Sequence, residues 1–91
     1  MTNVTARQVR IHGRVHGVGF RAATVAQARV FGLQGWVANR PDGTVEAQFE
    51  GPSDAVAAVV GWCAAGPRLA VVDWVEELPA AVEGWEGFVI R

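Results

Sequence analysis

The sequence predicts a single α+β domain with the element order β-α-β-β-α-β, in which two helices cover one face of an antiparallel sheet. Three observations support this fold class. Residues 8–14 and 44–50 alternate apolar and polar side chains, and a period of two is typical of strands. Two other stretches, one from residue 21 and one from residue 53, repeat apolar residues every three or four positions, as helices do. A chain of 91 residues has room for only one hydrophobic core.

The first part of the domain is predicted to be a strand, a glycine-containing loop and a helix. Gly17 and Gly19 interrupt the alternating pattern of residues 8–14. Residues 21–33 follow, and Gly32 and Gly35 mark the end of this helix. Its buried face is predicted to be the apolar stripe Ala23, Ala26, Val30 and Leu33.

A hairpin follows, and its turn, Pro41-Asp42-Gly43, is the clearest in the chain. Proline presets its own φ, and glycine takes the positive φ that such turns need. The turn joins strands at residues 34–40 and 44–50, which must therefore pair antiparallel. In the second strand we expect Val45, Ala47 and Phe49 to face the core and the polar set Thr44, Glu46, Gln48 and Glu50 to face solvent.

A second helix and one or two strands complete the domain. Ser53 is predicted to cap this helix, and Gly66-Pro67 to end it. Its buried stripe is predicted to be Val56, Val59, Val60 and Cys63. Residues 69–75 predict a strand, and residues 86–91 a short last one. This order is the ferredoxin-like split βαβ plan, which we assign to residues 7–91, with residues 1–6 as a short tail.

Composition argues against several classes of protein. The longest apolar run, residues 55–60, is six residues, whereas a membrane-spanning helix needs about 20. No signal peptide is evident. A net charge of −1 disfavours nucleic-acid binding. A lone cysteine, Cys63, forms no internal disulfide, so we expect a reducing, cytoplasmic setting. With two histidines and no ligand-spaced pairs, no metal site is expected.

The segment that carries chemistry is residues 13–21, Gly-Arg-Val-His-Gly-Val-Gly-Phe-Arg, between the first strand and the first helix. Glycines at 17 and 19 let the backbone turn several N–H groups inward to form a concave anion site. The helix that follows adds the positive end of its dipole. Arg21 stands at the start of that helix, where its guanidinium can bind the same anion. Loop, dipole and arginine together predict a site for a phosphoryl group or a carboxylate.

The glycines of this segment allow two other interpretations. Gly17 and Gly19 could simply form a tight strand-to-helix turn. The run of residues 17–22 also fits a dinucleotide-binding pattern, but the hairpin that follows allows no parallel βαβ unit, and the chain is too short for a two-half nucleotide-binding sheet. A P-loop is excluded because no Gly-Lys-Ser/Thr occurs.

The nine-residue segment 13–21 resembles the signature loop of the acylphosphatase family. Residues 35–46, Gly-Trp-Val-Ala-Asn-Arg-Pro-Asp-Gly-Thr-Val-Glu, resemble that family's second motif. The resemblance implies a small cytoplasmic hydrolase that cleaves the carboxyl–phosphate bond of acyl phosphates, releasing a carboxylate and inorganic phosphate, with no metal and no organic cofactor. It implies that Arg21 is the catalytic arginine and that Asn39 orients the attacking water. The phosphate-binding loop is implied to be Val15, His16, Gly17, Val18, Gly19, Phe20 and Arg21.

The chain departs from the family pattern at two positions, with His16 where glutamine is common and Ala38 where arginine often precedes the asparagine. We expect His16 to act as a loop donor or an exposed polar group and not as the catalytic base. A monomer is the default expectation. One rival is a non-catalytic phosphate- or carboxylate-binding module of the same fold. Another is an RNA-binding module, which would need exposed aromatic residues and a basic surface.

Overall fold

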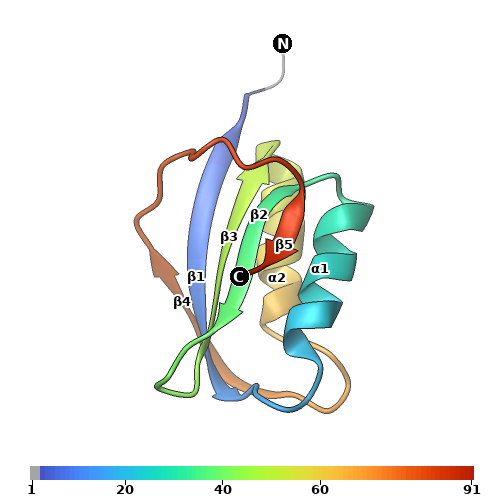
Figure 1. The fold of residues 1–91 in the computed structure, drawn as a ribbon, viewed down its shortest axis with the longest axis vertical. Coiled ribbons are helices and arrows are strands. Elements are labelled where there is room, and N and C mark those ends of the chain that lie inside the picture. The colour runs from blue at the N-terminus through green and yellow to red at the C-terminus, as the bar shows by residue number, and fades with distance from the viewer. Residues whose placement is uncertain (1–2) are drawn as a thin grey trace.

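A computed structural model describes residues 3–91, which form one five-stranded sheet covered on one face by two helices (Figure 1). The elements are β1 (Thr5–Arg14), α1 (Phe20–Val30), β2 (Gln34–Asn39), β3 (Val45–Gly51), α2 (Ser53–Cys63), β4 (Val71–Leu78) and β5 (Phe88–Ile90). The strand order is β4-β1-β3-β2-β5. Helix α1 packs on the β2 and β5 side of the sheet, and α2 packs on β1 and β3. The α+β ferredoxin-like prediction is therefore confirmed.

The sheet is mixed and not wholly antiparallel. Strands β1, β2, β3 and β4 pair antiparallel, as expected. The short last strand β5 pairs parallel to β2, with Gly35 opposite Phe88 and Val37 opposite Ile90. The cause is the connection from β4 to β5, residues 79–87, which crosses from one edge of the sheet to the other (Figure 1). This crossing brings the C-terminus beside the middle of β2.

The hydrophobic core lies between the sheet and the two helices, and strand alternation builds it as predicted. Val9 pairs opposite Ala47 and Ile11 opposite Val45, and all four side chains are fully buried on the helix-covered face. The α2 stripe Val56, Val59, Val60 and Cys63 is buried, as predicted. Each of these buried aliphatic side chains contributes about 1.5–3 kcal/mol relative to an exposed one.

The predicted buried face of α1 was wrong at Ala26 and Val30, although Leu33 is buried as predicted and Ala23 is half-buried. The helix buries Phe20, Thr24 and Ala28, while Ala26 and Val30 are exposed. Alanines occur on every side of this helix, so the apolar pattern defines no single stripe. Thr24 can be buried because its hydroxyl donates a hydrogen bond to the Phe20 carbonyl at 2.8 Å. Such a bond satisfies a polar group that would otherwise be costly to bury.

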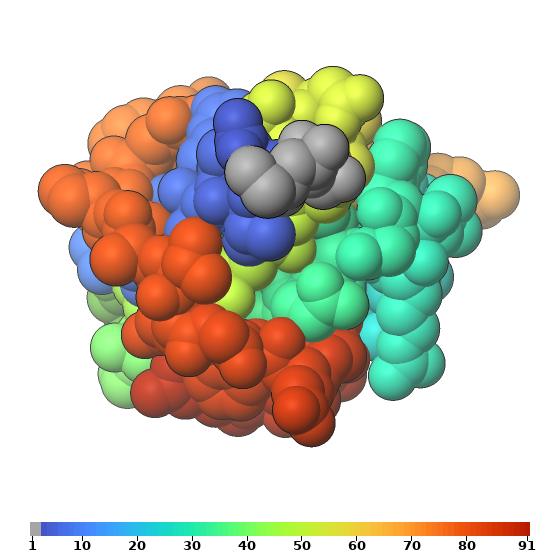
Figure 2. Space-filling view, turned by 90° about the horizontal axis from the view of Figure 1, so that it is seen from above, coloured from blue at the N-terminus to red at the C-terminus, as the bar shows by residue number. Residues whose placement is uncertain are grey.

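The polar face of β3 was also predicted incorrectly: Thr44, Glu46, Gln48 and Glu50 are all buried, none more than 6% exposed. The β4–β5 connection covers the end of this face that holds Gln48 and Glu50 (Figure 2), and Arg10 of β1 donates to the Glu46 carboxylate at 2.9 Å. The side-chain amide of Gln48 donates to the Ala81 carbonyl at 2.9 Å. The Glu50 carboxylate accepts hydrogen bonds from three consecutive backbone N–H groups, at residues 83–85. One carboxylate thus holds the segment that delivers β5 to its edge of the sheet.

Element boundaries differ from expectation at two places. Strand β1 begins at Thr5, whose hydroxyl donates to the Gly51 carbonyl, so pairing extends into the expected tail of residues 1–6. The first two residues of that tail lie outside the described part of the chain. Pro52 and not Ser53 occupies the N-cap of α2, and no side chain caps that helix. Neither described helix is long and apolar enough to cross a membrane.

We predict that Glu50 makes stability depend on pH in the acidic range. Burial raises the pKa of Glu50, but hydrogen bonds from Glu83, Gln48, Trp85 and Gly84 lower it more, to a net value below the ordinary 4.5. The stabilisation is therefore complete above pH 4.5 and is lost as pH falls through the lower pKa of the folded state. Urea unfolding of the unmodified chain and of Glu50→Gln should show a stability gap near pH 7 that narrows progressively as the pH falls below 4.5. An unchanged gap would contradict this assignment.

We predict that Gly35→Ala destabilises the fold far more than Gly32→Ala does. Both glycines have positive φ, +136° and +67°, so an alanine strains either backbone by about 1–2 kcal/mol. A Cβ at Gly35 would also lie 1.9 Å from the Gln48 carbonyl oxygen, whereas nothing lies within 4 Å of one at Gly32. Denaturant unfolding should give a loss of about 3 kcal/mol or more at Gly35. Equal losses at the two sites would show that strand packing does not require this glycine.

Candidate anion-binding active site

A cavity of about 240 Å³ opens where the β1–α1 loop meets the C-terminal end of β2. Its lining comes from four separate parts of the chain: the loop, the first turn of α1, the end of β2 and the end of β5. The lining residues are Val15, Gly17, Gly19, Phe20, Arg21, Ala22, Asn39 and Ile90. The fold therefore brings Arg21 and Asn39, 18 positions apart in the sequence, to one cavity.

The loop takes a conformation that requires its two glycines. Gly17 and Gly19 have φ of +71° and +78°, in the left-handed region. Gly19 is also the N-cap of α1, and no side chain caps the helix. The N–H groups of the first helical turn therefore keep their hydrogen-bonding capacity, and the positive end of the helix dipole adds to their attraction for an anion. An anion in the adjoining cavity would satisfy both.

Two buried side chains hold the ends of this loop. Val15 and Phe20 are 1% and 2% exposed, and both belong to the main core cluster. The Phe20 ring packs against Trp62 on α2, with ring centroids 5.5 Å apart. Because the side chains at the loop ends are buried in the core, the two ends of residues 16–19 are held at a fixed distance from each other. This anchoring favours one backbone conformation and so prearranges its N–H groups.

His16 ties the loop to the β2–β3 turn. Its Nε2 lies 2.8 Å from the Thr44 carbonyl oxygen, and since a carbonyl only accepts, the ring nitrogen must be the donor. Thr44 is itself held by Asp42, which accepts from its N–H at 3.0 Å and its hydroxyl at 2.6 Å. These two hydrogen bonds lower the pKa of Asp42 below its ordinary value. The expected role of His16 as a loop donor is thus observed.

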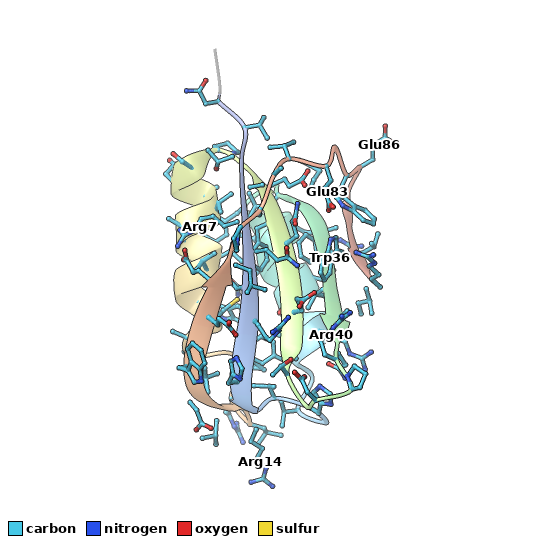
Figure 3. The ribbon with its side chains drawn as sticks, turned by 90° about the vertical axis from the view of Figure 1, so that its left-hand side faces the viewer. Arg7, Arg14, Trp36, Arg40, Glu83 and Glu86 are labelled. Atoms are coloured by element: carbon cyan, nitrogen blue, oxygen red, sulfur yellow. The ribbon has the colours of Figure 1, made fainter. Side chains whose placement is uncertain are left out.

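Arg21 is solvent-exposed at the start of α1 and makes no ion pair with any other residue in the range 3–91. Arg14 and Arg40 lie at the same end of the molecule, and neither is ion-paired within the described residues (Figure 3). Glu83 and Glu86 lie at the opposite end. The net charge is only −1, but these arginines add positive charge at the cavity end, which also holds the Asp42 carboxylate of the β2–β3 turn, and so support anion binding there.

Asn39 is the last residue of β2 and pairs with Val45, which fixes its side chain on the helix-covered face of the sheet. Its Oδ1 atom is buried and accepts no hydrogen bond from any described residue. Such orphaned acceptors are rare in folded proteins and cost about 1–3 kcal/mol. The cavity is therefore lined by an amide side chain whose oxygen has no donor among the described residues, beside an arginine suited to an anion.

Six of the eight sequence-predicted site residues line the cavity, and two do not. The His16 side chain is hydrogen-bonded to Thr44 and does not line the cavity, and Val18 is half-buried against the core. Ala38 lies on the opposite face of β2 from Asn39, so its difference from the common arginine does not alter the cavity wall. Sequence reasoning missed Ile90 as a lining residue. Its alternation with Phe88 predicted a strand, but nothing local indicated parallel pairing beside β2.

Comparison with known proteins agrees with this geometry. The sequence profile described as acylphosphatase matches residues 7–90. An acylphosphatase of Thermococcus kodakarensis is 51% identical over 82 residues, covering 90% of each chain. One of Nitrobacter hamburgensis is 56% identical over 75 residues, covering 82% of this chain and 76% of the other. The structure of an acylphosphatase from Coxiella burnetii superposes with a TM-score of 0.93 at 34% identity, covering 98% of this chain and 94% of that one. The chain therefore belongs to the acylphosphatase family and is an enzyme of that kind, a hydrolase.

Proposed function

We propose that this acylphosphatase hydrolyses acyl phosphates by direct attack of a water held on Asn39 upon a phosphoryl group bound by the β1–α1 loop and Arg21. The observation that carries the proposal is that Asn39 lines the same cavity as Arg21 and the glycine loop, while its buried Oδ1 accepts no hydrogen bond from any residue in the range 3–91. An acceptor oxygen accepts a hydrogen bond from water and thereby directs a lone pair of that water at the phosphorus.

The same oxygen distinguishes catalysis from mere binding. A site that only holds phosphate or carboxylate gains nothing from a buried carbonyl-type oxygen, because an acceptor beside an anion is electrostatically unfavourable. A site that must hold a water beside the phosphoryl group needs such an acceptor. Asn39 therefore favours the hydrolytic function over a non-catalytic binding module of the same fold.

The chemical step needs little more than positioning and charge. The water oxygen forms a bond to phosphorus as the bond between phosphorus and the acyl oxygen breaks, and the carboxylate leaves. The attacking water gives up one proton, which the inorganic phosphate takes up. The reaction is therefore balanced without a protein base. The loop N–H groups and Arg21 stabilise charge on the phosphoryl oxygens, a type of stabilisation worth about 10²–10³ in rate per donor.

No covalent intermediate on the protein enters this proposal. Burial raises the pKa of Cys63 to about 12, and its thiol lies in the core under α2. His16 already donates to the Thr44 carbonyl. Positive charge comes from Arg21 and the helix terminus, so the proposal includes neither metal nor cofactor. It also describes a monomer in the cytoplasm with no nucleic-acid or membrane partner, on the compositional grounds given above.

We predict different kinetic defects for the two central residues. Arg21→Ala should remove both binding and turnover, lowering kcat/KM for benzoyl phosphate by about 10³ or more, because a charged donor to the phosphoryl group is lost. Asn39→Ala should lower kcat by about 10²–10³ with little change in inhibition by inorganic phosphate. Loss of ultraviolet absorbance reports hydrolysis, and the phosphate inhibition constant reports binding.

Arg7→Gln is a matched control for this experiment, since Arg7 is a half-exposed arginine ion-paired with Glu77 at the far end of the molecule (Figure 3). It should keep near-wild-type kinetics, because exposed ion pairs contribute about 0–1 kcal/mol to stability. If Asn39→Ala raised the phosphate inhibition constant as much as it lowered kcat/KM, the residue would be a binding group and the proposed water-holding role would be wrong.

A further inference from the structure

A second hollow of about 450 Å³ lies directly beside the anion-binding cavity. Its lining residues are Ala22, Val25 and Arg29 from α1 and Phe88, Val89 and Ile90 from β5. We call this hollow the α1–β5 groove. Ala22 and Ile90 line both the groove and the anion-binding cavity, so the two are adjacent.

The groove runs along α1 away from the anion-binding loop. Ala22, Val25 and Arg29 are spaced three and four residues apart, which places them in one row on the helix surface. From Ala22 to Arg29 the helix rises about 10 Å at about 1.5 Å per residue. Helix α1 and strand β5 lie side by side in both ribbon and space-filling views and pack against each other (Figures 1 and 2).

The chemistry of the groove changes along its length. Near the anion-binding cavity it is apolar, with Ala22, Val25 and a half-exposed Ile90. At the far end stands Arg29, which makes no ion pair with any residue that the structure describes. An apolar channel that starts at one anion site and ends at an unpaired guanidinium complements a molecule with an anionic group at each end and an apolar chain between them.

We infer that the α1–β5 groove binds the acyl part of the substrate and that Arg29 selects acyl groups ending in a second anion. The inference rests on the proposed function, because it assumes a phosphoryl group in the β1–α1 loop. Since an extended acyl chain advances about 1.25 Å per carbon–carbon bond, about eight carbons span about 9 Å, and the flexible Arg29 side chain covers the remaining distance. The favoured substrate class is thus a medium-length acyl phosphate with a terminal carboxylate or phosphate.

Three probe substrates test this inference: acetyl phosphate, octanoyl phosphate and the monophosphoryl anhydride of octanedioic acid. With the unmodified chain, kcat/KM should rise by about tenfold or more from acetyl to octanoyl phosphate, because apolar chain is buried in the groove. It should rise again by about fivefold for the diacid derivative, because its far carboxylate meets Arg29. Rates equal for all three substrates would overturn the inference.

Arg29→Glu separates substrate recognition from a structural role of this residue in the last turn of α1. The ratio of kcat/KM for the diacid derivative to that for octanoyl phosphate should fall by about tenfold or more, and 8-aminooctanoyl phosphate should become the preferred substrate. A structural defect would lower all rates together and leave these ratios unchanged. Only direct contact between the side chain at position 29 and the end of the acyl chain would make the amino derivative the preferred substrate.

Arg7→Glu is the matched control, since it changes net charge by the same amount at the other end of the molecule. It should leave the substrate ratios as they are in the unmodified chain. Equal ratios in Arg29→Glu and Arg7→Glu, with acetyl phosphate still hydrolysed, would overturn the groove assignment and leave the proposed function standing. Failure of the unmodified chain to hydrolyse any probe would contradict the proposed function and the inference together.

Discussion

Burial of Val15 and Phe20 at the two ends of the β1–α1 loop is the constraint on which the site depends. These side chains join the core, so the backbone between them must pass through left-handed conformations at Gly17 and Gly19 to begin α1 where it does. The same geometry leaves the first N–H groups of α1 without a side-chain cap. The core thus holds a cluster of N–H donors in a fixed arrangement. Unlike water molecules, these donors do not have to reorganise around an incoming anion.

The remaining elements supply what the loop lacks. Strand pairing at the end of β2 places an acceptor, Asn39, beside these donors. The β4–β5 connection, held by the Glu50 carboxylate, leads into β5, which brings Ile90 against the cavity and forms one wall of the α1–β5 groove. The buried polar side chains of the sheet therefore affect the site indirectly, because they hold the connection that leads into β5. A change that releases Glu50 from the connection would act on the shape of the groove as well as on stability.

Local pattern was sufficient for most of the fold and for the central residues of the site. Alternation located β1 and β3, and the Pro41-Asp42-Gly43 turn predicted the antiparallel pairing of β2 with β3. The motifs around Arg21 and Asn39 named the residues that share the cavity. Long-range contacts could not be predicted this way. The face of α1 was ambiguous because alanines occur on all sides of the helix. The burial of Glu50 depends on the β4–β5 connection, more than 25 residues away in sequence, and Glu46 is hydrogen-bonded by Gln8 and Arg10 of β1. Ile90 entered the site through a parallel pairing that has no local signal.

The central claim is that water attacks phosphorus in the cavity formed by Arg21, Asn39 and the β1–α1 loop. The most direct test is hydrolysis of benzoyl phosphate in ¹⁸O-labelled water with a chelator present, followed by mass spectrometry of both products. The account predicts one labelled oxygen in the inorganic phosphate and none in the benzoate. Label in the benzoate would show that water attacks the carbonyl carbon, and would contradict the roles assigned to Arg21 and Asn39.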